Sequence, residues 1–411
     1  MIFLTIIIHK QKRKSMKRVF ISFAMIAMLA SCHKNSVVAG NDSRVDAAPA
    51  SSAVVTVTQA TTFNDLFTRN GSDANRTVSA GGGWTGGDAG YSILLPNNKH
   101  LWLFGDSFLG QVNGAYPNRT RPTGTGGVQL TKGNVAFTQN TDGTVTTYKD
   151  PSSAVGSNGA EAAYIKTNVA GEYFWPFEGY YNSGTNKVYV LLYRWKSVSG
   201  NIQFLGTWVA RISYPALAVE AITNLNKGTT VAYGSAVMLD GGYAYIYGSE
   251  TSGSTKYLHV ARVLPGSIEN TNAWEHYIVD ANLNPIWHNN NPSTSFSIRI
   301  HNGNSNEVSV HKNGTNYYLI TMKPGIVNDS IFRYKSSSPV GPFNNQLFLY
   351  KAPAPPSSPA GNWRYNAKAH PAFVNGTQLL ISYCTNNTSL SNVYSHADSY
   401  RPYFIWVSGW Q

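Results

Sequence analysis

Two aspartates stand where they could act together on a substrate. Asp88 and Asp106 lie 18 residues apart in the stretch GGDAGYSILLPNNKHLWLFGDSFLG. Apolar runs at 91–95 and 101–104 flank a polar turn at 96–99, a pattern that predicts a β-hairpin. In a regular hairpin the two carboxylates face each other with Cβ atoms about 5 Å apart. Their repulsion raises one pKa, which suits acid–base catalysis. The alternative is that each aspartate forms a turn or a cap beside its glycine.

Two glutamates compete for the role of general acid. Glu178 lies in the almost wholly apolar segment WPFEGYY, where burial raises the pKa of a carboxyl group as a general acid requires. The alternative for Glu178 is a structural ion pair with Arg194. Glu250 closes another hairpin and is the rival acid, or else an exposed loop residue in GSETSGST.

Aromatic, cationic and imidazole side chains beside these acids are candidates for sugar binding, because aromatic faces stack on sugar rings. We expect Glu307 and Lys323 to form a plain cross-strand ion pair, and His311 to be solvated at a turn. His370 could bind a cation, bond a sugar hydroxyl or simply pack. The substrate-binding candidates are Trp84, Trp175, Arg194, Glu250, Lys323, His370 and Tyr383.

The opening hairpin recurs along the chain, and Asn-Gly or Asp-Gly turns mark several of its copies. The five copies span 86–110, 173–195, 233–250, 306–323 and 370–385. Later strand candidates follow each copy, at 134–148, 204–213, 256–264, 330–337 and 402–408. Repeated four-stranded units predict an all-β, five-bladed β-propeller, in which the open hairpin ends meet at one mouth of a central channel. A β-helix is disfavoured because the spacing is too long, and a β-sandwich because the strands are too many.

The N-terminus predicts export and lipidation. Residues 1–31 carry six basic side chains and an apolar run at 19–30 that is short for a membrane span, as in a signal peptide. Its end, Leu-Ala-Ser-Cys, resembles the lipobox of bacterial lipoproteins, in which the cysteine (here Cys32) is lipidated. Met16 is an alternative start, and an uncleaved anchor is the alternative topology. We expect a flexible tether at 32–60, a single propeller domain at 61–411, and attachment to the cell envelope on the periplasmic or surface side of the outer membrane.

Composition excludes several functional classes. The 411 residues are 13% charged and 13% aromatic, with 37 glycines, as in extracytoplasmic β proteins. Without the leader, the net charge of +12 falls to +6 and forms no basic stripe, so no nucleic-acid partner is expected. Cys384 would be the one cysteine left beside a lipidated Cys32, which rules out a disulfide framework. No GxSxG, HExxH or P-loop motif occurs. We expect a monomer that requires no cofactor, although a channel cation such as calcium is compatible with the fold.

The stretch around Asp88 and Asp106 resembles the first blade of bacterial lipoproteins that carry the pattern GD…G…S…LPDG…LWLFGDTF. These belong to families of five-bladed propellers related in fold to arabinanase and β-xylosidase-type glycoside hydrolases. One related family that shares the GD[ST]F element includes endo-D-arabinanases. The resemblance implies that Asp88 and Asp106 are active-site acids. This chain departs from the pattern at the Asn-Asn turn and at Ser107, neither of which replaces a carboxylate.

Together these features predict a glycan-active protein. The first hypothesis is a glycoside hydrolase that acts on a furanose-containing, arabinan-like polysaccharide through Asp88, Asp106 and Glu178. The second is a non-catalytic lipoprotein that binds polysaccharide or oligosaccharide, and the third is a scaffolding propeller. The hydrolase requires clustered carboxylates with one raised pKa, whereas the binding protein predicts aromatic side chains with carboxylates locked in salt bridges.

Overall fold

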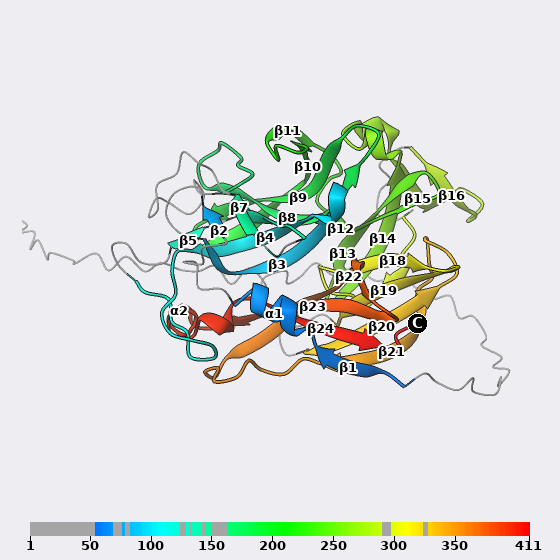
Figure 1. Cartoon of the computed structure of the whole chain (residues 1–411). Coiled ribbons are helices and arrows are strands. Elements are labelled where there is room, and N and C mark those ends of the chain that lie inside the picture. The colour runs from blue at the N-terminus through cyan, green and yellow to red at the C-terminus, as the bar shows by residue number, and fades with distance from the viewer. Residues whose placement is uncertain are drawn as a thin grey trace, which may run out of the picture.

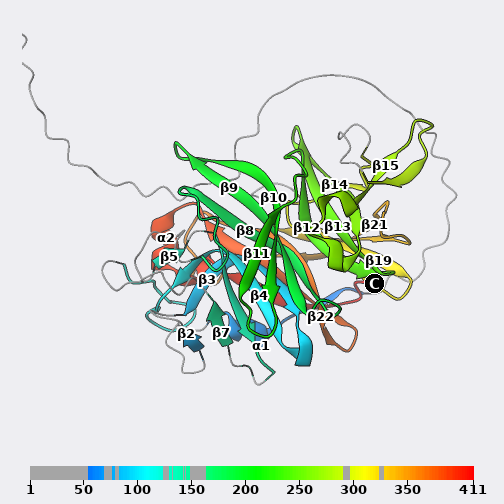
Figure 2. The same ribbon diagram turned by 90° about the horizontal axis from the view of Figure 1, so that it is seen from above.

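The computed structural model describes residues 54–68, 76–78, 83–123, 129–131, 133–141, 143, 145–148, 163–289, 297–323 and 328–411. Its strands form five separate sheets arranged around one axis (Figure 1). Seen from above, the β8–β11 sheet stands beside the sheet that contains β12–β14 (Figure 2). The predicted all-β, five-bladed propeller is therefore confirmed. The predicted signal peptide and the predicted lipidation site Cys32 lie outside the described residues.

Each blade begins with its innermost strand. Blade 1 contains β3 (Trp84–Leu94), β4 (His100–Leu109), β6 (Val135–Gln139), β7 (Val145–Tyr148) and β2 (Arg76–Val78), with β5 (Gln129–Thr131) on β4. Blade 2 contains β8 (Glu172–Asn182), β9 (Lys187–Val198), β10 (Asn201–Ser213) and β11 (Val219–Asn224). Blade 3 contains β12 (Val231–Asp240), β13 (Tyr243–Ser252), β14 (Thr255–Val263), β15 (Glu275–Val279) and β16 (Pro285–His288), with β17 (His301–Asn302) on β14.

Blade 4 contains β18 (Ser309–Asn313), β19 (Asn316–Met322), β20 (Ser330–Ser336) and β21 (Asn344–Lys351). Blade 5 contains β22 (Asn362–Asn375), β23 (Gln378–Asn387), β24 (Pro402–Ser408) and β1 (Thr56–Gln59). All five predicted hairpins are present, and the 134–148 segment supplies two strands. The innermost strands of blades 1 and 5, β3 and β22, contact each other and close the ring.

The chain's first strand completes the last blade. β1 pairs antiparallel with β24, so Thr56–Gln59 belong to the fold. The expectation that the tether extends to residue 60 is therefore wrong at its end: Val57 packs against the blade-5 core, and the backbone N–H of Ala60 donates to Phe404. Pairing the first strand with the last blade joins distant parts of the sequence and covers the open edge of β24.

Aromatic side chains fill the seam where the ring closes. Helix α1 (Thr61–Leu66) leads into Phe67, which is fully buried. The Phe67 ring lies 4.6 Å from the Phe404 ring of blade 5 and 5.6 Å from the Trp84 ring of blade 1. Such tilted and edge-to-face contacts add to the stability gained from burial. This seam holds blade 1 in a fixed position relative to blade 5.

The regular hairpin pattern is interrupted in four innermost strands. Their pairing with the next strand shifts register at 87–91 in β3, 176–179 in β8, 233–236 in β12 and 365–368 in β22. Such bulges insert an extra residue and re-aim the neighbouring side chains. Three of the four shifts contain or adjoin the charged residues described below.

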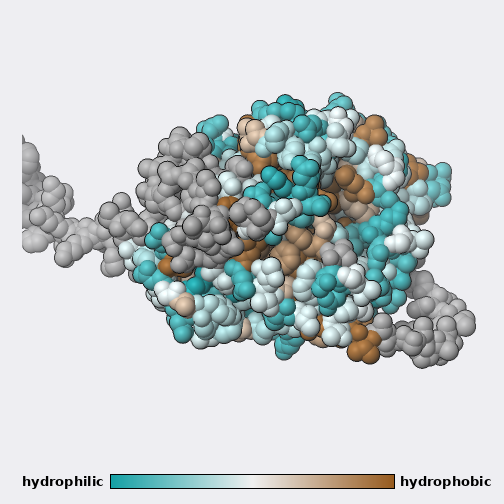
Figure 3. All heavy atoms as spheres, in the orientation of Figure 1, coloured by the Kyte–Doolittle hydropathy of each residue, from teal (hydrophilic) through white to brown (hydrophobic). Residues whose placement is uncertain are grey.

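The surface is mostly polar. On the face shown in Figure 3, hydrophobic residues in the middle are bordered by mainly hydrophilic ones. In the part of the chain that is described, no helix has the length and apolar character of a membrane span.

Candidate active site

The bulge in β3 gives Asp88 its position. Gly87 pairs with Ser107 and Ala89 with Phe104, so Asp88 falls within the irregular part of the ladder and does not face Asp106 in a regular pair. Ala89 and Gly90 both adopt positive φ, at 65° and 68°, which turns the chain sharply after the carboxylate. A Cβ atom on Gly105 would lie only 2.4 Å from Oδ1 of Asp88. The glycine of the GDSF motif therefore leaves the space that the Asp88 carboxylate occupies.

Asp88 is half-buried and surrounded by polar groups from other parts of the ring. The Tyr365 hydroxyl, on β22, donates to Oδ2 of Asp88 over 2.8 Å. Burial, followed by the charges of Asp106 and Glu307, raises the pKa of Asp88 to about 7. The hydrogen bonds from Tyr365 and Tyr400 act in the opposite direction. At neutral pH this carboxyl group is therefore close to half ionised and can exchange protons in both directions.

Asp106 is held by hydrogen bonds that favour a carboxylate. Its Oδ1 accepts from the backbone N–H of Gly133 over 2.8 Å and from the Trp175 indole N–H over 3.0 Å. The backbone carbonyl of Asp106 accepts from the Tyr400 hydroxyl over 2.9 Å. Asp106 thus has fixed orientation, and its charge is one cause of the raised pKa of Asp88.

The bulge in β8 gives Glu178 its position. The ladder passes from Pro176–Leu192 to Gly179–Val190, which leaves Phe177 and Glu178 in the irregular segment. Burial raises the pKa of Glu178 to about 8. The charge of Lys368 lowers this pKa and the charge of Glu307 raises it further. Because Lys368 belongs to blade 5 and Glu307 to blade 4, the Glu178 carboxyl group points towards the axis of the ring.

Glu307 and Lys368 form a buried ion pair across blades 4 and 5. The Lys368 Nζ atom lies 2.6 Å from Oε2 of Glu307 and also donates to the carbonyls of Ala89 and Asn366. The Asn366 amide donates to the other Glu307 oxygen. The expected Glu307–Lys323 pair is therefore wrong, because Glu307 turns inward ahead of β18 while Lys323 lies 5.1 Å from the Phe332 ring.

The structure also corrects the expected ion-pair partner of Arg194 and the expected exposure of Glu250. Arg194 pairs with Glu172, at 2.6 Å, and not with Glu178, because residue 172 enters β8 beside it while 178 lies within the bulge. Glu250 is not an exposed loop residue: it is buried and bonded to His259 and Arg299. Burial acts to raise the pKa of Glu250, but hydrogen bonds from Arg299 and His259 outweigh it and lower the pKa. The carboxyl group therefore stays ionised, which does not suit a general acid.

Several aromatic and imidazole candidates lie in the core. Trp84 is fully buried beside Phe104, and Tyr383 is stacked on Tyr403. His370 is buried, with its two ring nitrogens 2.8 Å from the hydroxyls of Ser92 and Ser382, so it packs. His311, expected to be solvated, is also buried, and burial lowers its pKa to about 4. These side chains are therefore part of the packed interior.

Trp175 differs from these buried aromatics. Its half-buried indole bonds to Asp106 and its ring lies 5.0 Å from that of Trp195, which is also partly exposed. The two rings form an accessible aromatic surface beside the carboxylates. Lys368, Tyr365 and Tyr400 were missed because their contacts cross blades. One sequence signal could have identified Lys368: it lies in the strand that precedes the Asn375-Gly376 turn, which is the innermost strand of its blade.

The charged partner of Glu307 is the ammonium group of Lys368. Among the described residues, no group of three or more His, Cys, Asp and Glu side chains could hold a metal ion. The channel cation considered from the sequence stays a prediction.

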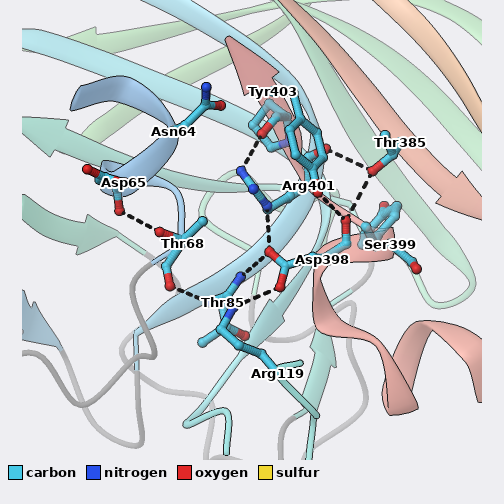
Figure 4. A network of polar contacts seen from close by, with 12 residues as sticks. Asn64, Asp65, Thr68, Thr85, Arg119, Thr385, Asp398, Ser399, Arg401 and Tyr403 are labelled. Carbon is cyan, nitrogen blue, oxygen red and sulfur yellow. Dashed lines mark hydrogen bonds and ion pairs between the residues drawn. The ribbon is translucent and has the colours of Figure 1, made fainter. Parts of the chain in front are cut away.

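A second buried network joins the chain after α1 to the residues just ahead of β24 (Figure 4). Asp398 accepts from Arg119 at 2.7 and 3.0 Å and from Arg401 at 2.7 Å. Arg119 also donates to the Thr68 carbonyl, which ties in the chain after α1. Tyr400 follows this network directly in sequence, and its hydroxyl reaches Asp106. The network therefore fixes one of the groups that surround the carboxylates.

Comparisons with known proteins were made for the whole chain. A family model described as a domain of unknown function, DUF5005, matches residues 61–410. A presumed hydrolase from Bacteroides ovatus has a similar structure, with a TM-score of 0.69 and 23% identity over 88% of this chain and 93% of that one. An α-L-arabinofuranosidase from Podospora anserina has a TM-score of 0.43 and 11% identity, over 81% of this chain and 95% of that one. An arabinanase from Bacillus subtilis has a TM-score of 0.39 and 9% identity, over 79% of this chain and 98% of that one.

No curated protein matches the chain in sequence. The similarity to the Bacteroides protein shows a shared fold alone, so a function must be argued from the side chains of the site.

Proposed function

The chain belongs to the DUF5005 family, and from that premise we propose that it is a glycoside hydrolase in which Glu178 is the general acid and Asp88 the base. The observation that carries the proposal is that these two carboxyl groups lie at bulges in neighbouring blades, and that burial and the charge of the same residue, Glu307, raise the pKa of both. In the described structure neither has a cationic ion-pair partner, unlike Glu307, Glu172 and Glu250. Carboxylates locked in salt bridges would have favoured a non-catalytic binding protein.

The raised pKa values support this division of roles. With a pKa of about 8, Glu178 is mostly protonated at neutral pH and can give its proton to the leaving oxygen. Asp88, with a pKa of about 7, is ionised in a substantial fraction of molecules and can accept a proton from water. As the water oxygen bonds to the anomeric carbon, the glycosidic C–O bond breaks. Glycoside hydrolysis in general uses such a pair of carboxyl groups.

The surrounding groups support these roles without entering the bond changes. Asp106 is a fixed carboxylate whose charge holds the pKa of Asp88 up. Trp175 offers a partly exposed ring beside it, on which a sugar face can stack. We assign a furanose-containing, arabinan-like polysaccharide as substrate, supported by the resemblance of 86–110 to arabinan-active propellers.

Product analysis on a polysaccharide panel tests this function. The mature protein, Asp88→Asn and Asp106→Asn are incubated with arabinan, xylan and related polymers, and the released oligosaccharides are separated. We expect release by the wild type and a large loss in both variants. Full activity in both variants would remove the catalytic assignment. Binding without any release by the wild type would establish the non-catalytic glycan-binding function instead.

We also infer export and lipid attachment at Cys32, supported by the basic and apolar leader and its lipobox-like end. Metabolic labelling with a radioactive fatty acid, comparing the wild type with Cys32→Ala, tests this. Label in the wild type alone is expected; equal label in both would contradict lipidation at this residue.

A further inference from the structure

A groove with a volume of about 630 Å³ lies between blades 3 and 4, away from the carboxylates of the proposed active site. Tyr257, Arg299 and His301 line it from blade 3, and Lys323, Tyr334 and Phe343 line it from blade 4. None of Asp88, Asp106 and Glu178 is among its lining residues. Its size falls within the range of small-molecule binding pockets.

A buried polar chain holds Arg299 rigidly on one wall. The Ser297 hydroxyl bonds to His259, His259 bonds to Glu250, and Glu250 accepts from Nε and Nη2 of Arg299 at 2.9 and 2.8 Å. Glu250 and His259 are buried, whereas the Arg299 side chain is 43% exposed. The guanidinium lies 3.8 Å from the centre of the Tyr257 ring. The buried His259 and Glu250 side chains thus hold the Arg299 guanidinium in one position at the groove. The proposed hydrolysis uses none of these three residues.

Lys323 supplies the second cation, from the opposite wall. Its side chain is exposed, and in the described parts of the chain no carboxylate forms an ion pair with it. Glu250 largely offsets the charge of Arg299, so Lys323 gives the groove its uncompensated positive charge. Since two of the three Arg299 nitrogens are used by Glu250, Nη1 still has N–H donors to offer to a ligand.

The rest of the lining suits a sugar. Amide side chains from the two blades lie along the groove, and they can donate to and accept from hydroxyl groups. They are Asn302, Asn344, Asn345 and Gln346. The Tyr334 ring, which is mostly buried and lies 4.2 Å from that of His301, forms part of the groove wall.

We propose that this groove is a second glycan site, which binds an oligosaccharide that carries carboxylate groups, such as a uronic-acid chain. Lys323 and the free edge of Arg299 bind the carboxylate, and the amides bind the hydroxyls. The site would hold an acidic polysaccharide against the propeller while another part of it reaches the central carboxylates. A neutral oligosaccharide lacks the carboxylate, so it forms no ion pair with Lys323 or Arg299 and binds more weakly.

Calorimetric titration with trigalacturonate tests the site, with arabinotriose as the neutral probe. Wild type, Lys323→Gln and Lys351→Gln are compared; Lys351 is an exposed lysine at the end of β21 that does not line the groove. We expect Lys323→Gln to weaken trigalacturonate binding about tenfold or more, and Lys351→Gln to leave it unchanged. Added salt should weaken binding to the wild type.

Glu178→Gln separates this proposal from the proposed catalysis. The groove predicts that Glu178→Gln binds trigalacturonate as the wild type does, even if hydrolysis is absent or never observed. Three results would overturn the groove site: no trigalacturonate binding by the wild type, equal weakening in the two lysine variants, or loss in Glu178→Gln with none in Lys323→Gln.

Discussion

The Tyr365 hydroxyl lies 2.8 Å from Oδ2 of Asp88, so the last blade of the ring orients the carboxylate of the first. The bond stabilises the ionised form of Asp88 and lowers its pKa, against the larger effect of burial. The balance leaves this pKa at about 7, between that of an ordinary aspartate and that of a permanently neutral one. The reactivity of blade 1 therefore depends on closure of the propeller by blade 5.

Tyr365→Phe should raise the pKa of Asp88. Because the variant lacks the hydroxyl that favours the carboxylate, we expect the acidic limb of the kcat/KM profile to move up by roughly one pH unit. The profile of kcat/KM against pH measures this shift. Tyr317→Phe is the matched control, since it removes a hydroxyl that bonds to Asp240 at the surface over 2.7 Å. An unchanged limb in Tyr365→Phe, or the same shift in the control, would contradict this role.

Lys368→Met should destabilise the protein. The substitution leaves Glu307 buried without its cation, and breaking a buried pair in this way costs about 3–5 kcal/mol. Denaturant unfolding measures the free energy. The double variant Lys368→Met/Glu307→Gln contains no unpaired charge at this position, so we expect it to recover part of the loss. A double variant no more stable than Lys368→Met would show that the charge pair is not the cause.

Glu178→Gln should be more stable than the wild type at alkaline pH. The folded-state pKa of Glu178, about 8, lies above its ordinary value, so folding favours the protonated form. That stability is complete below the ordinary pKa and is lost as the pH rises through about 8. The advantage of Glu178→Gln should therefore grow between about pH 5 and about pH 9 in urea unfolding. A constant difference across this range would mean that Glu178 has no raised pKa.

Asp398→Asn should weaken the closure of the ring. Asp398 bonds to two arginines that are almost fully buried, and the substitution removes the negative charge that pairs with them. We expect a loss of about 3–5 kcal/mol in denaturant unfolding. Asp240→Asn is the control, because its Lys312 partner is exposed and such pairs contribute at most about 1 kcal/mol. Similar losses in both variants would contradict a special role for the buried network.

The fold was predictable because the information for each blade is local. Asn375-Gly376 and Asp240-Gly241 mark tight turns between apolar runs, and both glycines adopt the positive φ that such turns need. The position of β1 was not predictable, because Thr56–Gln59 pair with a strand more than 340 residues later. A short polar strand at an edge has no local signal that separates it from a tether.

The site was predictable only as residue types. Asp88, Asp106 and Glu178 stood out by their flanking residues, but their partners come from other blades. A regular hairpin would place Asp88 directly opposite Asp106. In the structure, Ala89 and Gly90 adopt positive φ and form a bulge, so Asp88 does not pair with Asp106 across the strands. Lys368 carries no local sign of its role, since its contact with Glu307 depends on how β22 packs against blade 4.

The central claim is tested most directly by changing the leaving group of the substrate. Dinitrophenyl arabinofuranoside needs no proton to release its phenolate, whereas arabinan does. We expect Glu178→Gln to keep most of the wild-type rate on the aryl substrate while losing about 10²-fold or more on arabinan. Asp88→Asn should lose activity on both. Equal losses of Glu178→Gln on the two substrates, or wild-type rates in Asp88→Asn, would contradict the assigned acid and base.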